Sequence, residues 1–309
     1  MKVRFILNPT AGRSGRLKAL SGAVKKVLAA EEGIFEIRSA ADRSGMRDLA
    51  ADAVAKGYEV VFACGGDGTI NDVASELVGK GTALGILPAG SGNALARALG
   101  IPEDVEEGVR LLKTGRIAKM DVGVACGRYF FSTAGFAFEA RLSRRYNKGR
   151  LSRRLRGLSP YFMLAPWEFL RFRPGPVRLS IDGKDIDGKP LLLTAANTSH
   201  LGGGAVIAPG AENDDGLLDF CFVHRTGIFS ALDLARRLLS GKIDKHGRYE
   251  TARGRKAVIM GRDFRDAHVD GEPFQWPGDV DISVLYRKLN VLVPESGRSE
   301  RTASPGPPP

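Results

Sequence analysis

The stretch Phe62–Asn71, FACGGDGTIN, places three glycines and one carboxylate between a strand-like apolar run and a helix-like run. The run before it, YEVVFAC, is apolar, and the run after it, TINDVASELVG, has apolar residues at helical spacing. Such a turn is typical of an ordinary strand-to-helix connection. It is equally typical of a loop whose backbone amides approach a phosphate while Asp67 faces a nucleotide or its metal ion.

The residues around this turn alternate between strand-like and helix-like runs. The expected strands are VRFIL, IFEIR, YEVVFAC and ALGILP, and the expected helices lie within 15–30, 45–57, 69–79, 93–100 and 103–115. Strands that alternate with helices across short connections predict a parallel sheet covered on both faces. We therefore expect a doubly wound α/β nucleotide-binding domain over residues 1–118, with its ligand site beyond the carboxyl ends of the strands.

From residue 119 onward strand-like segments follow one another, separated by turn signals such as DGK and DDG. This texture predicts an all-β second domain, a β-sandwich, over residues 119–294, interrupted by a basic helical segment and by the helix-like run 227–241. Whether the last strand returns to the first domain is left open. The tail 295–309 is polar and proline-rich, which predicts disorder.

The composition, 43% hydrophobic and 26% charged residues, is that of a globular protein. The three cysteines are widely spaced in apolar runs, which argues against a disulfide framework and against a sulfur-bound metal. No signal peptide is recognisable, and no run reaches the roughly 18 apolar residues of a membrane-spanning helix. We expect a cytoplasmic protein that associates peripherally with a membrane.

Two more glycine-rich loops follow neighbouring strands of the first domain. NPTAGRSG, 8–15, comes after the first strand, and LPAGSGNALAR, 87–97, comes after the fourth. Because the carboxyl ends of parallel strands meet at one edge of the sheet, the three loops predict a shared nucleotide site. The chain contains neither the P-loop pattern nor the GxGxxG fingerprint.

Together, NPTAG, GGDGT and PAGSGNALAR resemble the motifs of the lipid kinase superfamily that includes diacylglycerol, sphingosine and ceramide kinases. The resemblance covers roughly residues 1–294 and implies an ATP- and Mg²⁺-dependent lipid kinase whose α/β domain is similar to those of NAD kinases and phosphofructokinases. By position, the family pattern assigns ten residues to ATP: Asn8, Thr10, Gly12, Ser39, Gly65, Gly66, Asp67, Gly68, Thr69 and Ser91.

Two stretches of the second domain resemble further motifs of this family, SHLGGGAVIAPGAENDDGLLDF at 199–220 and HVDGEPF at 268–274. The resemblance implies that Glu272 is the general base for the lipid hydroxyl and that Asp270 orients it or shares its role. It also implies a magnesium ion held by Asp215 and the main-chain carbonyl of Leu217, with Glu212 as a further candidate ligand. Phosphoryl transfer needs such positioning and charge neutralisation.

The lipid itself stays open. Bacterial diacylglycerol kinases of this family usually carry an aspartate after the asparagine of the third loop, whereas this chain has Asn93-Ala94, which is nearer the sphingosine and ceramide kinase pattern. Two alternatives are an NAD kinase-like enzyme and a non-enzymatic lipid-binding or regulatory protein on the same fold.

The net charge of +11 is concentrated in a basic block, residues 141–156, which contains eight cations and no acidic residue. Either the block is a solvated helix face or it docks on an anionic membrane surface, with Phe162, Trp167 and Phe169 entering the interface. No nucleic-acid reader motif accompanies it, so we expect no nucleic-acid partner. A homodimer is left open.

Overall fold

The computed structural model describes residues 1–11, 16–148, 159–261 and 265–295. The chain divides into two compact units: unit 1 comprises Met1–Asp121 and the residues from Tyr286 onward, and unit 2 comprises Val122–Leu285. Two long strands, β5 (Gly115–Ala125) and β18 (Val280–Pro294), run from one unit into the other.

Unit 1 contains a parallel sheet in the order β2-β1-β3-β4-β18. Its strands are β1 (Lys2–Leu7), β2 (Ile34–Ser39), β3 (Val60–Gly65), β4 (Ala83–Pro88) and the end of β18. Every residue of β3 and β4 is buried, as expected for central parallel strands that are covered on both faces.

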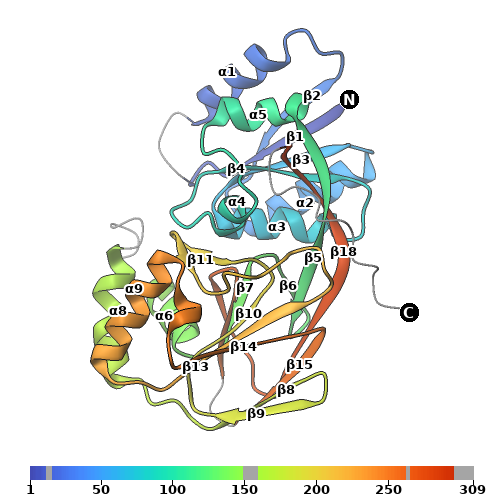
Figure 1. Ribbon diagram of the computed structural model, residues 1–309. Coiled ribbons are helices and arrows are strands. Elements are labelled where there is room, and N and C mark those ends of the chain that lie inside the picture. The colour runs from blue at the N-terminus through green and yellow to red at the C-terminus, as the bar shows by residue number, and fades with distance from the viewer. Residues whose placement is uncertain (12–15, 149–158, 262–264, 296–309) are drawn as a thin grey trace. The chain divides into compact units, whose positions relative to one another are not determined.

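The helices of unit 1 cover the sheet on both faces (Figure 1). They are α1 (Arg16–Leu28), α2 (Arg43–Ala55), α3 (Asp67–Leu77), α4 (Ala94–Ala98) and α5 (Val105–Thr114). The first three connect β1 to β4 in turn, and α4 and α5 lead from β4 to β5. Helix α1 packs with α5, and α2 packs with α3. Asp42 and Asp104 cap the N-termini of α2 and α5 by accepting hydrogen bonds from Gly45 N (2.7 Å) and Glu107 N (3.0 Å).

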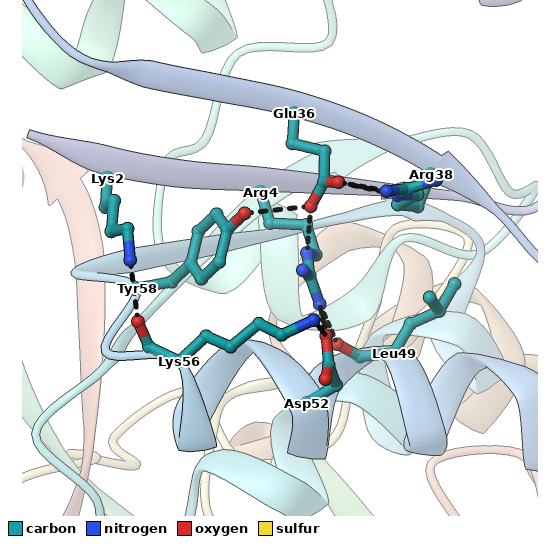
Figure 2. A network of polar contacts seen from close by, with 8 residues as sticks. All are labelled: Lys2, Arg4, Glu36, Arg38, Leu49, Asp52, Lys56 and Tyr58. Atoms are coloured by element: carbon teal, nitrogen blue, oxygen red, sulfur yellow. Dashed lines mark hydrogen bonds and ion pairs between the residues drawn. The ribbon is translucent and has the colours of Figure 1, made fainter.

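A buried arginine ties the sheet of unit 1 to helix α2 (Figure 2). Arg4, 2% exposed on β1, donates to Glu36 Oε2 at 2.7 Å, to Asp52 Oδ2 at 2.8 Å and to the Leu49 carbonyl at 2.9 Å. Its guanidinium also lies 4.4 Å from the ring centroid of Tyr58, whose hydroxyl donates to Glu36. Burial raises the pKa of Glu36, but the hydrogen bonds from Tyr58, Arg38 and Arg4 outweigh it and lower that pKa overall.

Unit 2 is built from two sheets and a short hairpin. Its strands are β6 (Arg128–Phe130), β7 (Thr133–Gly135), β8 (Val177–Ile181), β9 (Lys184–Gly188), β10 (Pro190–Ala196), β11 (His200–Gly202), β12 (Ala205–Val206), β13 (Leu218–His224), β14 (Tyr249–Gly254), β15 (Lys256–Met260), β16 (Asp266–Val269) and β17 (Glu272–Gln275). One sheet has the order β14-β13-β10-β7-β16-β17, and the other contains β18-β15-β8-β9 with β5 and β6.

The core of unit 2 lies between these sheets. Leu179 on β8 and Ile259 on β15 pack in one cluster with Phe220 and Phe222 on β13. The intervening residues of β13, such as Cys221, point to a second cluster on the opposite face, as strand alternation requires. The predicted combination of a doubly wound α/β domain with a β-sandwich is confirmed.

Helices cover the second cluster of unit 2. They are α6 (Phe138–Lys148), α8 (Ser159–Arg171), α9 (Ile228–Ser240) and the short 3₁₀ helix η1 (Ile243–Lys245). Phe169 from α8 and Leu234 from α9 both pack against this cluster. None of the helices in the described part of the chain combines the length and apolar character needed to cross a bilayer.

Candidate active site

The three glycine loops of unit 1 lie at one edge of its sheet. The strand registers pair Leu7 with Ser39 and with Cys64, and pair Gly65 with Pro88, so the four parallel strands end together. Ser39 ends β2 and is exposed, as is Ser91 in the loop after β4. Gly12 lies outside the described residues.

The first loop is joined to the GGDGT turn by one side chain. Asn8 Nδ2 donates to Thr69 Oγ1 at 3.0 Å, while Asn8 Oδ1 accepts from the main-chain N–H and the hydroxyl of Thr10 at 3.0 and 2.7 Å. Asn8 therefore uses both ends of its amide to hold two loops that are 61 residues apart.

Glycine is required at this place because Gly66 lies against Gly90 of the third loop and Gly65 lies against Thr69 of its own turn. A Cβ added to Gly90 would lie 2.7 Å from Gly66 Cα, and one added to Gly65 would lie 2.4 Å from Thr69 Oγ1. Gly66 is also the N-cap of α3 and provides no side-chain cap. The first turn of α3, which includes Gly68, thus has the backbone character of an anion site.

Asp67 holds the third loop in place. Its Oδ2 accepts from Asn93 N at 2.9 Å and its Oδ1 accepts from Ala94 N at 2.8 Å. Asn93 adopts a left-handed conformation with φ 50°, and its side-chain oxygen accepts from Gly90 N at 2.9 Å. Asn93 therefore shapes the loop, and Ala94 contributes a main-chain amide to the Asp67 carboxylate.

In unit 2, Asp270 and Gly271 form the two-residue turn of the β16–β17 hairpin. Their φ values of 47° and 83° are both positive, as a type I′ turn requires, and Val269 pairs with Glu272 across it. The Asp270 carboxylate accepts three main-chain hydrogen bonds, from Phe131 N (2.9 Å), Ser132 N (2.8 Å) and Thr133 N (3.1 Å). Asp270 thus anchors the turn to the segment before β7.

Further contacts hold the same turn. Asp270 N donates to the Thr133 carbonyl at 2.8 Å, and the Ser143 hydroxyl of α6 donates to the Gly271 carbonyl at 2.7 Å. Gly271 N donates to His268 Nδ1 at 3.3 Å. Glu272 follows directly and is half-buried, so its main chain is fixed by the turn.

A buried carboxyl and a buried imidazole lie behind this hairpin. A Cβ added to Gly135 would lie 2.3 Å from His268 Nε2 and 2.5 Å from Glu139 Cγ, so the two side chains meet above this glycine. Glu139 Oε1 accepts from Leu193 N (3.0 Å) and from the Thr194 hydroxyl (2.9 Å), whereas the buried Oε2 has no hydrogen-bond partner among the described residues.

Burial dominates the protonation of both groups. It raises the pKa of Glu139 to about 7, against the lowering effect of the hydrogen bonds from main-chain amides and Thr194. Burial also lowers the pKa of His268 to about 4. At neutral pH His268 is therefore uncharged, and because its Nδ1 accepts from Gly271, its proton is on Nε2.

The predicted metal-binding turn contains more acid than the motif indicated. Asp215 Oδ1 accepts from Leu217 N at 3.0 Å and its Oδ2 bonds Arg253, while Glu212 is exposed. Asp219, 6% exposed, has a buried Oδ2 that forms no hydrogen bond with any described residue. Burial raises the pKa of Asp219; Arg253 opposes this, and the negative charges of Asp215 and Glu212 add to it.

The described part of the chain has no group of three or more His, Cys, Asp or Glu side chains arranged to hold a metal ion. The site residues do fit a hard cation in donor type, because the carboxylate oxygens of Asp215 and Asp219 and the Leu217 carbonyl are the ligands that magnesium prefers. The buried Oδ2 of Asp219 forms no hydrogen bond with a described residue and lies 3.7 Å from Arg253 Nε, so a cation beside it would find an oxygen with free acceptor capacity.

The described arginines of the basic block form ion pairs with acidic residues of the same chain. Arg141 and Arg145 bond the two oxygens of Glu168 at 2.8 and 2.7 Å, and Arg144 pairs with Asp266 at 2.6 Å. Glu168 is only 1% exposed, so the two arginines join α6 to α8 around a buried charge.

The side chains of the other cations of the block lie outside the described residues, as does that of Phe162. These cations are Lys148, Arg150, Arg153, Arg154 and Arg156. Trp167 is 54% exposed, whereas Phe169 packs on the core.

Two family models match this chain. The model of the diacylglycerol kinase catalytic domain matches residues 2–125. The model of the YegS C-terminal NAD kinase beta sandwich-like domain matches residues 132–293. A diacylglycerol kinase of Mycobacterium tuberculosis (strain CDC 1551 / Oshkosh) is 31% identical over 306 residues, which cover 96% of each chain. The chain belongs to the diacylglycerol kinase family.

Other relatives agree with the family. A diacylglycerol kinase of Bacillus subtilis (strain 168) is 28% identical over 302 residues, covering 95% of this chain and 97% of that protein. A solved structure from Bacillus anthracis str. Sterne has the same fold, with a TM-score of 0.78 at 21% identity, and covers 96% of this chain and 98% of the other. The predicted resemblance is confirmed, and the protein is a lipid kinase, a phosphotransferase with an alcohol group as acceptor.

Sequence reasoning assigned no role to Glu139, His268 or Asp219. Two of them lie inside the quoted stretches: His268 in HVDGEPF, and Asp219 in the stretch 199–220, four residues after Asp215. The available signal for Glu139 was a single acidic residue in the apolar run STAGFAFEA, a pattern typical of a carboxyl that a helix turns inward.

Proposed function

We propose that this lipid kinase transfers the γ-phosphoryl group of ATP to the hydroxyl group of diacylglycerol, with Mg²⁺ as the cofactor. The relatives that carry the name diacylglycerol kinase support the substrate. The observation that carries the mechanism is the clamped Asp270–Gly271 turn, which fixes the main chain of Glu272.

In the proposed reaction Glu272 accepts the proton of the lipid hydroxyl. The hydroxyl oxygen then forms a bond to the γ-phosphorus, and the bond from that phosphorus to the bridging oxygen breaks, so ADP leaves with the electron pair. Asp270 is a positioning residue in this scheme, because its carboxylate is occupied by three main-chain donors.

On the nucleotide side, we assign the phosphates to the backbone amides of the GGDGT turn and the start of α3. This assignment is supported by the absence of a side-chain cap at Gly66, the N-cap of α3, and by the close backbone approach of Gly66 and Gly90. Asn8, Thr10 and Thr69 shape the edge of this site. Ser39, Ser91 and Gly12 remain candidates by position alone.

Asp215 and the Leu217 carbonyl would hold the magnesium ion, with Asp219 beside them. The ion would neutralise negative charge during phosphoryl transfer. Arg253, which bonds Asp215 and lies 3.7 Å from Asp219, compensates part of the same charge.

The experiment that tests the proposed function offers labelled ATP, with and without magnesium, and a panel of acceptors. The panel contains diacylglycerol, monoacylglycerol, sphingosine, ceramide, a polyprenol and NAD. Phosphorylation of diacylglycerol above the others is the expected result. Preferred phosphorylation of sphingosine or ceramide would instead support the similarity of Asn93-Ala94 to the sphingosine and ceramide kinase pattern. Labelling of NAD would support the NAD kinase-like alternative.

We also propose that the basic block 141–156 brings the kinase to anionic membranes. The test should leave Arg141, Arg144 and Arg145 unchanged, because they form ion pairs. Replacing them would leave the buried Glu168 or Asp266 without its cationic partners. The suitable variant therefore replaces Arg150, Arg153, Arg154 and Arg156 by Gln. Reduced sedimentation with anionic vesicles supports the proposal, and unchanged sedimentation refutes it.

A further inference from the structure

Helix α9 is apolar on the face that it turns to solvent. Four of its large apolar side chains are strongly exposed: Ile228 (42%), Phe229 (85%), Leu232 (62%) and Leu239 (47%). Phe229 has the highest exposed fraction of any large apolar residue in the described part of the chain. Phe229, Leu232, Arg236 and Leu239 follow one another at intervals of three and four residues, so they form one continuous stripe along the helix.

The opposite face of α9 is fixed to unit 2. Leu234 is buried and Leu238 partly buried against the cluster on the outer face of the six-stranded sheet. Ser230 Oγ lies 3.1 Å from Nε2 of the buried His246, just beyond η1. The helix is thus anchored by one apolar face while it exposes another. An exposed stripe of large apolar side chains on a helix that is already anchored by its other face is typical of an interaction surface.

Cations surround the exposed stripe. The segment 225–248 contains six cations and two carboxylates, a net charge of +4. Asp233 is already paired with Arg236 and Arg237. Four exposed cations beyond the helix ends form no ion pair with another described residue: Arg225, Lys242, Lys245 and Arg248.

We propose that this face of α9 is a membrane-docking surface, in which Phe229 and Leu232 enter the apolar boundary of an anionic bilayer while the flanking cations contact lipid phosphates. Apolar side chains ringed by lysine and arginine are the pattern of an interfacial helix. Long cationic side chains place their charge at the headgroups when the helix lies flat on the surface. The inference rests on the proposed function at one point only: diacylglycerol, the proposed substrate, is located in a bilayer.

A second copy of this chain suits the face less well. Two such stripes in a dimer would bring the unpaired cations of both copies together, and like charges oppose that contact. An anionic bilayer instead neutralises all of them at once. The charge pattern therefore selects the membrane surface as the occupant.

The test measures binding to sucrose-loaded vesicles with the full chain, without ATP and without any phosphate acceptor in the bilayer. Two vesicle types are compared, phosphatidylcholine alone and phosphatidylcholine with phosphatidylglycerol. The variants are Phe229→Ser with Leu232→Ser, Lys242→Glu with Lys245→Glu, and the control Ile117→Ser, which changes another exposed apolar residue, 50% exposed on β5 of unit 1. Thermal unfolding checks that all three variants are folded.

The wild type and the control are expected to sediment with the anionic vesicles. The apolar variant is expected to bind them at least about tenfold more weakly. The charge variant should lose binding to anionic vesicles in particular. Unchanged vesicle binding by both variants would overturn the proposal. So would a wild-type dimer in light scattering that the Phe229→Ser, Leu232→Ser variant converts to a monomer while vesicle binding persists. This experiment measures vesicle binding and no phosphoryl transfer. Its outcome therefore stands even if the protein fails to phosphorylate diacylglycerol.

Discussion

The carboxylate of Asp270 accepts a hydrogen bond from the main-chain N–H of Ser132 at 2.8 Å, across 138 residues of sequence. Together with the bonds from Phe131 and Thr133, this contact fastens the hairpin turn before Glu272 to the segment that leads into β7. A carboxylate with three main-chain donors is already occupied, which separates the positioning role of Asp270 from the proton-accepting role assigned to Glu272.

Asp270→Asn should loosen the turn. An amide nitrogen in place of one carboxylate oxygen would face a main-chain N–H, so one donor in this part of the chain loses its acceptor. We expect a loss of about 1–3 kcal/mol in the free energy of unfolding, together with a lower kcat. Denaturant unfolding measures the first effect, with the exposed Asp279→Asn as the control. Equal stability of the two variants would contradict the clamp.

Glu139→Gln should change how stability depends on pH. The folded pKa of Glu139 is about 7, above its usual 4.5, so its contribution to stability is fully present below pH 4.5 and is lost as the pH rises to 7. The wild type should therefore lose on the order of 3 kcal/mol relative to the variant between these values. Denaturant unfolding at several pH values checks this, with the exposed Glu59→Gln as the control.

His268 works in the opposite direction. Its folded pKa of about 4 lies below its usual 6.5, so its contribution is present above pH 6.5 and is lost as the pH falls toward 4. In the wild type the two slopes oppose each other between about pH 4.5 and 6.5. Glu139→Gln should reveal the His268 slope alone. A difference between variant and wild type that does not vary with pH would contradict the burial of the Glu139 carboxyl.

Arg4→Met should destabilise unit 1, because it leaves the half-buried Glu36 without the buried one of its two arginine partners and the Leu49 carbonyl without its side-chain donor. The expected loss is about 2–3 kcal/mol, reduced from that of a fully buried pair because Glu36 keeps Tyr58 and Arg38. The matched control is Arg38→Met, which removes an arginine that is 58% exposed from the same carboxylate and should cost little. Equal losses for the two variants would disprove the central role of Arg4.

Asp219→Asn should weaken magnesium binding by about tenfold, because it removes the charge from the unbonded oxygen beside Asp215. The rise of the unfolding temperature with magnesium concentration measures the affinity without any turnover. Asp244→Asn, at an exposed position on η1, is the control. The same magnesium dependence in all three proteins would remove Asp219 from the metal site.

The fold of unit 1 was predictable because its pattern is local. Runs such as VVFACG and ALGILP are continuously apolar, as central parallel strands require, and the glycine loops between them follow from the same alternation. The convergence of those loops needed only the rule that parallel strands end at one edge. The two-sheet architecture of unit 2 was predictable from its succession of strand-like segments and turn signals.

The contacts that give the site residues their particular tasks were not predictable, because they join residues far apart in sequence. Nothing near Asp67 in the chain indicates that its carboxylate bonds the amides of Asn93 and Ala94. Likewise, the basic block gave no sign that Glu168, more than twenty residues later, neutralises Arg141 and Arg145. Charge counted along a sequence does not include such pairing.

The most direct test of the central claim is the turnover of Glu272→Gln with labelled ATP and diacylglycerol in mixed micelles, beside Glu250→Gln, an exposed glutamate of β14. If Glu272 accepts the hydroxyl proton, kcat should fall by about 10²–10⁴-fold, while nucleotide binding by the same variant stays unchanged and Glu250→Gln behaves as the wild type. Turnover by Glu272→Gln close to that of the wild type would contradict the account.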